Sequence, residues 1–130
     1  MMIWSNRALD ALLAGLRDGI DAATEPGQLA LHALPVPATP GGSGGTEQAR
    51  ITLTKPCGSI TAQALQFGLP LETLRSGGEQ IGWARLSDGA GRWLADCSVG
   101  VTGSGESIQL DNLAGYPGGT VQLTAAAIGF

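Results

Sequence analysis

The stretch Gly82–Gly100, GWARLSDGAGRWLADCSVG, points to the fold class more clearly than any other part of the chain. Apolar and polar side chains alternate on both sides of Asp88-Gly89-Ala90-Gly91. Alternation with a period of two is the pattern of a half-buried β-strand. Asp and Gly between two such runs are typical of a tight turn, since Gly adopts positive φ without steric cost. The stretch therefore predicts a β-hairpin with strands at 81–87 and 92–99.

The same alternation recurs along most of the chain, between clusters of Gly, Pro, Ser and Asn. It predicts further strands at 28–34, 50–55, 59–66, 107–111 and 120–126. Residues 67–78 are ambiguous, and Pro70 argues against a central strand there. About seven short strands without any βαβ alternation are typical of a mainly β fold. We expect an antiparallel β-sandwich with one N-terminal α-helix, and a jelly-roll connectivity is one candidate.

Residues 5–23 give the helical pattern of the chain. An apolar stripe with helical spacing is formed by Leu9, Leu12, Leu13, Leu16 and Ile20. Ser5 or Asn6 can cap the start, and Pro26 follows the end. Two interpretations stay open. The helix either packs on the sheet or, as residues 1–25, forms an arm that reaches a neighbouring subunit, and Trp4 suits the second role.

Residues 35–49, PVPATPGGSGGTEQA, have the composition of a long loop. Pro35, Pro37 and Pro40 make its first part stiff, and the Gly/Ser-rich part that follows predicts flexibility. A chain of 130 residues fits one domain. We therefore expect a single domain over 1–130, with the arm at 1–25, the flexible loop at 35–49 and a β body at 50–130.

Charge and cysteine content limit the classes of binding partner and the cellular compartments that fit this sequence. The net charge is −4, charged residues make up 14% of the chain, and Lys and Arg do not cluster. This argues against binding to nucleic acid or to anionic membranes. The N-terminus lacks the pattern of a signal peptide, and no apolar run has the length of a membrane span. Cys57 and Cys97 are expected to be reduced thiols, as in proteins made and used in the cytoplasm.

The search for catalytic chemistry yields no convincing group. His32 is the single histidine, so the usual zinc ligand sets cannot form. No Gly-x-Ser-x-Gly elbow accompanies it, and no glycine cluster is followed by Lys-Ser or Lys-Thr. We expect no catalytic residue, metal or cofactor. A small hydrolase using His32 and a carbohydrate-binding module with Trp83 and Trp93 as stacking platforms are the alternatives from other classes.

The chain resembles a family of small bacteriophage and prophage virion proteins. The matching stretches run in order along the chain: Ser5-Asn6-Arg7-Ala8-Leu9-Asp10-Ala11-Leu12-Leu13, Pro37-Ala38-Thr39-Pro40, Leu53-Thr54, Gly82-Trp83-Ala84-Arg85-Leu86-Ser87-Asp88, Asp96-Cys97-Ser98-Val99-Gly100, Leu110-Asp111-Asn112 and Val121-Gln122-Leu123-Thr124. Residues 67–80 align with nothing in the family pattern. Each motif is short and structural, so the resemblance describes a fold family better than a role.

The resemblance implies a structural protein of the virion, assembled in the host cytoplasm. Its most plausible role is a capsid decoration or cement protein, a homo-oligomer that binds the major capsid protein. A tail or baseplate component is the alternative. The residues expected to meet a partner protein are Trp4, Leu9, Leu13, Pro35, Pro37, Pro40, Trp83 and Trp93.

Overall fold

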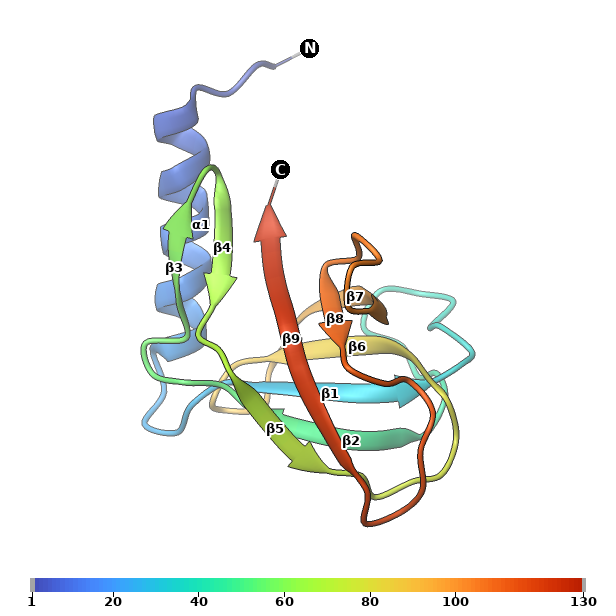
Figure 1. Cartoon of the computed structure of the whole chain (residues 1–130). Helices are drawn as coiled ribbons and strands as arrows, with labels where there is room; N and C mark the ends of the chain where they lie inside the picture. Colours follow the sequence, from blue (N-terminus) through green and yellow to red (C-terminus); the bar gives the residue numbers. More distant parts are fainter. Residues whose placement is uncertain (1, 130) are drawn as a thin grey trace.

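One helix and nine strands make up the computed structural model, which describes residues 2–129 (Figure 1). In chain order they are α1 (Asn6–Asp21), β1 (Gln28–Ala33), β2 (Glu47–Thr52), β3 (Gly58–Thr61), β4 (Ala64–Phe67), β5 (Leu71–Leu74), β6 (Ile81–Ser87), β7 (Trp93–Val101), β8 (Ile108–Leu110) and β9 (Thr120–Gly129). The expected mainly β fold with an N-terminal helix is confirmed. The hairpin of the opening stretch is β6 and β7.

The strands form one curled sheet in the order β2-β1-β6-β7-β8-β9-β4-β3. Strand β5 lies outside this order and pairs with β9 alone. All pairs are antiparallel except β7 and β8, which run parallel. The curl brings edge strand β2 against β5, and the backbone N–H groups of Ser76 and Gly77 donate to the Gln48 carbonyl at 2.7 and 3.2 Å. The sheet is therefore mixed, and it bends round until its edge strand β2 meets β5.

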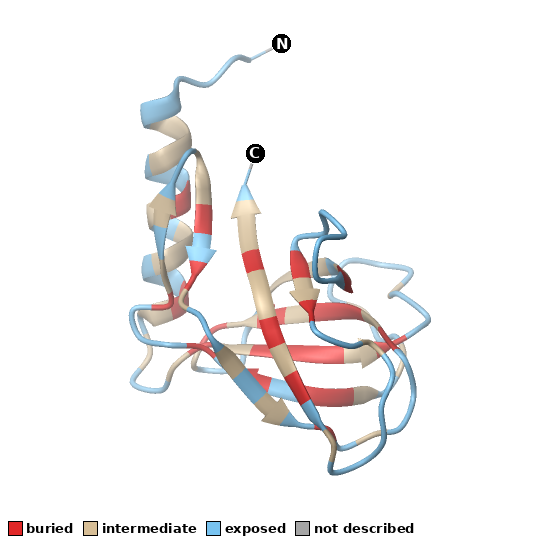
Figure 2. Cartoon of the chain, in the orientation of Figure 1, coloured by how far each residue is buried: buried red, intermediate tan, exposed pale blue. Residues whose placement is uncertain are grey.

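The core lies inside this curl (Figure 2). The predicted alternation of β1 is confirmed in part. Leu29, Leu31 and Ala33 are buried while Gln28 and His32 are only partly covered, but Ala30, expected on the same face as Gln28 and His32, is buried as well. Leu86 on β6 is fully buried beside them. Each such leucine stabilises the fold by about 1.5–3 kcal/mol relative to an exposed one.

Helix α1 packs against the β3–β4 hairpin through one side of its stripe. The Ser5 hydroxyl accepts the Ala8 N–H at 3.1 Å, which confirms Ser5 as the cap. Leu13 and Ile20 are buried, whereas Leu12 is exposed. The segment before the helix leads away from the β body (Figure 1). The helix therefore docks on the sheet and also carries a projecting end.

One strand prediction is wrong, and the segment whose pattern is ambiguous contains a strand. Residues 59–66 form a hairpin of β3 and β4 rather than one strand, turned at Ala62 (φ 52°) and Gln63 (φ 58°). Positive φ is unusual for such residues, and neither residue is a turn signal. The ambiguous segment contains β5, and Pro70 falls in the break between β4 and β5, which pair with successive parts of β9. Pro70 thus interrupts the strand without preventing it.

The boundary of the expected loop is also wrong. Residues 47–49 belong to β2, with Leu31 opposite Ala49 in the register with β1. Gln48 and Ala49 are buried. The glycine run masked this start, because Thr46-Glu47-Gln48-Ala49 has no strong strand propensity of its own. Tertiary pairing with β1 overrides the local signal, and the loop spans 34–46.

Candidate functional site

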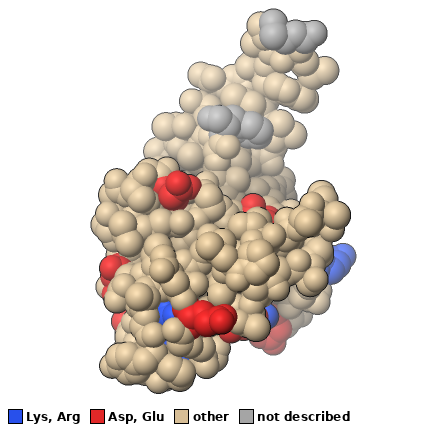
Figure 3. Space-filling model, turned by 90° about the vertical axis from the view of Figure 1, so that its right-hand side faces the viewer, with Lys and Arg blue, Asp and Glu red and all other residues tan. Residues whose placement is uncertain are grey.

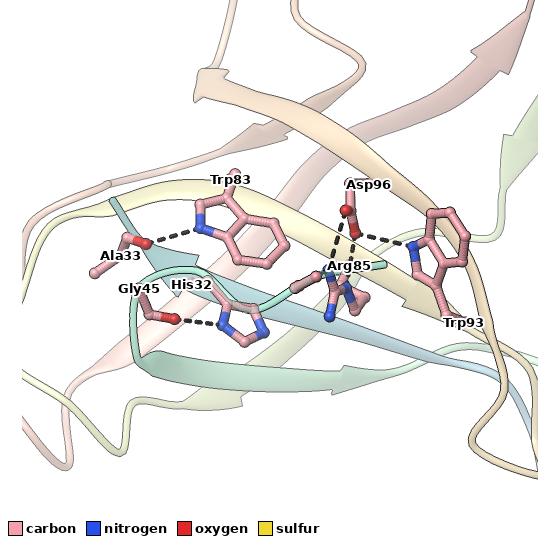
Figure 4. Close-up of polar contacts among 8 residues, drawn as sticks. His32, Ala33, Gly45, Trp83, Arg85, Trp93 and Asp96 are labelled. Atoms are coloured by element: carbon pink, nitrogen blue, oxygen red, sulfur yellow. Dashed lines mark hydrogen bonds and ion pairs between the residues drawn. The ribbon is translucent and has the colours of Figure 1, made fainter. Parts of the chain in front are cut away.

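A row of aromatic and charged side chains crosses the outer face of the sheet, away from the core (Figure 4). We call it the aromatic ladder, and it consists of His32 on β1, Trp83 and Arg85 on β6, and Trp93 and Asp96 on β7. The register places His32 opposite Trp83 and Arg85 opposite Asp96. A register shift beside Leu86 pairs Trp93 with Ser87 and brings its indole toward Asp96. Because alternate residues of β6 point inward, the ladder occupies the opposite face.

Stacking and charge hold the ladder together. The His32 and Trp83 rings stack with centroids 4.3 Å apart, and the Arg85 guanidinium lies 5.1 Å from the Trp83 ring. Arg85 Nε and Nη2 donate to the two Asp96 carboxylate oxygens at 2.8 and 3.1 Å, and Trp93 Nε1 donates at 3.1 Å. The hydrogen bond from Arg85 lowers the pKa of Asp96, and the same bond raises the pKa of Arg85. Both groups are therefore charged at neutral pH.

Side chains of the aromatic ladder hold the glycine-rich loop through hydrogen bonds to backbone carbonyls. Trp83 Nε1 donates to the Ala33 carbonyl at 2.8 Å, Arg85 Nη2 to the Gly42 carbonyl at 2.7 Å, and His32 Nδ1 to the Gly45 carbonyl at 2.9 Å (Figure 4). A Cβ on Gly45 would lie 1.9 Å from the Ala33 carbonyl oxygen. The glycine is therefore required by a close approach of two backbone segments. A loop expected to be flexible has specific anchors on the sheet.

The structure brings part of the predicted interaction set together. Pro35, Pro37 and Pro40 lie in the gripped loop, whose backbone covers Trp83, while Trp93 lies beneath Gly41. Trp4, Leu9 and Leu13 belong to the helical end of the chain. That set therefore divides into two groups on different elements.

Two of these residues are poorly placed for a partner. Trp83 is 2% exposed and Leu13 is buried against the β body, so neither side chain offers a free surface. Trp83 is covered because it anchors the loop, and Leu13 because, with Ile20, it docks α1 on the β body. For the same reason Trp83 does not form an open sugar-stacking platform with Trp93, which is 44% exposed.

His32 is occupied in the ladder. Among the described residues its one side-chain hydrogen bond is to the Gly45 carbonyl, and its ring stacks on Trp83. A histidine that serves as a general base needs a nucleophile within hydrogen-bond reach. In residues 2–129 the histidine has instead the contacts of a loop anchor.

A second feature of the outer face was not found from sequence. An open trough of about 710 Å³ runs over β1, between β2 and β6, and ends at the 88–91 turn. We call it the outer trough, and its lining includes Gln28, Ala30, His32, Glu47, Arg50, Arg85, Ser87 and Asp88. The one sequence feature that indicates the trough is the small residue Ala30 at an outward position of β1. This feature predicts a hollow only when the larger residues beside it on the neighbouring strands are known.

Over residues 2–129, no group of three or more His, Cys, Asp and Glu side chains is arranged to hold a metal ion. Helix α1 is too short and too polar to cross a membrane, and no other helix occurs in the described part of the chain. Comparison of the chain with protein-family models, curated proteins and solved structures finds no match. The functional proposal therefore depends on the geometry of this chain and on the motifs of its sequence.

Proposed function

We propose that the protein is a non-enzymatic structural protein of a phage virion that decorates the capsid by binding the major capsid protein. The observation that carries this proposal is the apolar end that projects from the β body. Met2, Ile3 and Trp4 are 71%, 85% and 51% exposed, and Leu12 on α1 is exposed behind them. Contiguous apolar residues in water mark a surface that another molecule covers.

The free energy gained by burying the arm's apolar side chains is appropriate for assembly into a lattice. Burying each of these side chains contributes about 1.5–3 kcal/mol, and the freedom lost on association offsets much of the sum. One arm by itself therefore supplies a weak contact. A lattice repeats the contact at many positions, and linked contacts add up to strong attachment. A homo-oligomeric decoration protein therefore needs only one modest arm per copy.

The anchored loop offers a second protein-binding element. Its side chains Leu34 and Val36 are exposed although its backbone is held by the aromatic ladder. Holding a loop in advance reduces the entropy lost on binding. The loop lies on the right of Figure 1, the side that faces the viewer in Figure 3, where acidic and basic side chains are scattered among uncharged ones.

The resemblance to small phage virion proteins supports the same role, because its motifs run in order over most of the chain. The motif positions include Trp83, Arg85 and Asp96, which hold the loop, and the start of α1, which carries the arm. The resemblance thus includes residues that shape the two protein-binding elements. It also supports a virion location after assembly in the host cytoplasm.

Binding to assembled shells tests the proposal. Capsid shells of the phage that encodes this chain are incubated with the wild type, with an Ile3→Asp/Trp4→Ala double variant, and with Tyr116→Ser as control. Tyr116 is also highly exposed, at 71%, but lies in the β8–β9 connection. We expect the wild type and the control to cosediment with shells, and the arm variant to bind roughly 100-fold more weakly.

Cryo-electron microscopy of the same samples decides the location. Density for the fold on the icosahedral shell supports the decoration role. Density on the tail would overturn it in favour of a tail or baseplate component. A wild type that binds neither shells nor tails would overturn the virion role altogether.

A further inference from the structure

The outer trough has a floor of one small residue between two arginines. In the sheet register Ala30 on β1 lies opposite Arg50 on β2 and opposite Arg85 on β6. All three residues line the trough. A methyl side chain between two guanidinium groups leaves the hollow that a larger residue would fill.

Three acidic side chains line the trough, and two of them, Glu47 and Asp88, are engaged inside the protein. Asp96, which lies outside the lining, pairs with Arg85. Both Glu47 oxygens accept from Arg50, through Nη2 at 2.5 Å and Nε at 3.2 Å. Both Asp96 oxygens accept from Arg85, and both Asp88 oxygens accept from the backbone of the turn or from Arg92. These three carboxylates have used the positions at which they could otherwise attract a cation. The third acidic residue of the lining, Glu25, makes no side-chain hydrogen bond in residues 2–129, and it lies at the end of the trough beside Pro26 and the 88–91 turn.

Between Arg50 and Arg85, away from Glu25, the polar groups without a partner are hydrogen-bond donors. In residues 2–129, Nη1 of Arg50 and Nη1 of Arg85 make no hydrogen bond, and the Ser87 hydroxyl makes none either. Guanidinium groups stay protonated and present their N–H groups in a fixed plane. Free donors on two sides of a hollow suit a group with several acceptor oxygens.

We propose that the outer trough binds an oxyanion group between Arg50 and Arg85, with Ser87 as a third donor. The group is a carboxylate or phosphate, and it belongs either to a small ligand or to an acidic segment of a partner protein. The volume of the trough suits a ligand larger than a single ion. The inference does not depend on the proposed capsid role, because the trough and the projecting arm are separate surfaces.

Titration monitored by amide and arginine NMR signals tests this site. The probes are inorganic phosphate, citrate, a tri-glutamate peptide and, as control, a tri-glutamine peptide, each added to the full-length protein. We expect saturable shifts confined to residues 28–32, 47–50 and 85–91 with at least one anionic probe. Saturation by phosphate or citrate alone identifies a small ligand, and saturation by the glutamate peptide alone identifies an acidic protein segment.

Three variants sharpen the test. Arg50→Gln should weaken binding roughly fivefold or more, since it removes one exposed guanidinium. Glu47→Gln should tighten binding, because it releases Arg50 from a competing carboxylate. Arg17→Gln, whose arginine pairs with Asp18 on α1, is the matched control and should change nothing. Arg50 is exposed on the outer face, so its loss leaves the core intact.

Three outcomes would overturn the proposal. One is the absence of saturable shifts at roughly 20 mM, where a millimolar site is still visible. Another is unchanged affinity in Arg50→Gln, and the third is shifts that centre outside the trough. None of them bears on shell binding by the arm, so failure of the two proposals is distinguishable.

Discussion

The His32 ring lies nearly parallel to the indole of Trp83, at 19° with centroids 4.3 Å apart, and both residues hold backbone carbonyls at the ends of one loop. His32 binds Gly45, and Trp83 binds Ala33. The stacked pair thus fixes the entrance and the exit of the 34–46 loop at one point on the sheet. His32 and Trp83, the residues of the two alternative functions from other classes, share a structural task.

Replacing Trp83 by Phe should loosen this loop while an aromatic ring still fills the space of the indole. The change keeps an aromatic ring but removes the N–H that donates to Ala33. We expect the free energy of unfolding to fall by about 1–2 kcal/mol, since a buried carbonyl loses its partner. Hydrogen exchange at residues 41–46 should accelerate. Urea unfolding and amide exchange measure the two effects.

Trp93→Phe is the control for that change. It removes an indole N–H to Asp96 at a half-exposed position, where water can replace the lost donor. The free energy of unfolding should fall by less than about 1 kcal/mol. Equal losses in the two variants would contradict the role of Trp83 as the principal loop anchor.

Asp88→Asn should remove a pH-dependent contribution of the β6–β7 turn. The Asp88 carboxylate accepts the N–H groups of Ala90 and Arg92 at 3.0 and 2.9 Å and the Arg92 side chain at 2.9 Å. The hydrogen bond from the Arg92 backbone, followed by those of the Arg92 side chain and Ala90, lowers the pKa of Asp88. A lowered folded-state pKa stabilises the fold above the unfolded pKa of about 3.9, and this gain is lost as pH falls through the folded pKa.

Thermal unfolding between pH 2 and pH 7 measures the effect. The variant should melt at a lower temperature than the wild type at pH 6–7, and the two curves should converge in acid. A difference that stays constant over this range would show that the Asp88 charge makes no contribution.

The β3–β4 turn should accept a stabilising change. Ala62 and Gln63 both have positive φ, the conformation of a type I′ turn, in which Asn-Gly is preferred. Ala62→Asn/Gln63→Gly should therefore raise the free energy of unfolding by about 1–2 kcal/mol, since each non-glycine residue is strained there. Urea unfolding checks this. Gly91→Ala, at φ 84° in the β6–β7 turn, is the matched opposite and should destabilise.

Both cysteines should react slowly with thiol reagents. Cys57 and Cys97 are free, and burial raises the pKa of each to about 11. At pH 8 the thiolate fraction is then on the order of 0.1%, against roughly a quarter for an unperturbed thiol. Labelling with an aromatic disulfide at pH 8 should be slow in the folded protein and fast in urea. Rapid labelling of the folded protein would contradict this.

The sequence by itself determined the elements with strong local signals. Alternation around Asp88-Gly89-Ala90-Gly91 predicts the β6–β7 hairpin because period and turn chemistry agree there. The stripe with Leu13 and Ile20, preceded by Ser5, predicts α1 and its cap for the same reason. In these segments each residue's local preference matches the final fold.

Tertiary structure decided the rest, because the physical causes lie in residues far apart in the chain. The Ala62-Gln63 turn has no local signal and exists because β4 pairs with β9. The pairing of β2 with β1 recruits residues 47–49 from an apparent loop. The aromatic ladder and the outer trough arise from cross-strand registers between β1, β2, β6 and β7. A register joins residues by hydrogen bonds across the sheet, and a single sequence does not contain that information until the strands have found their partners.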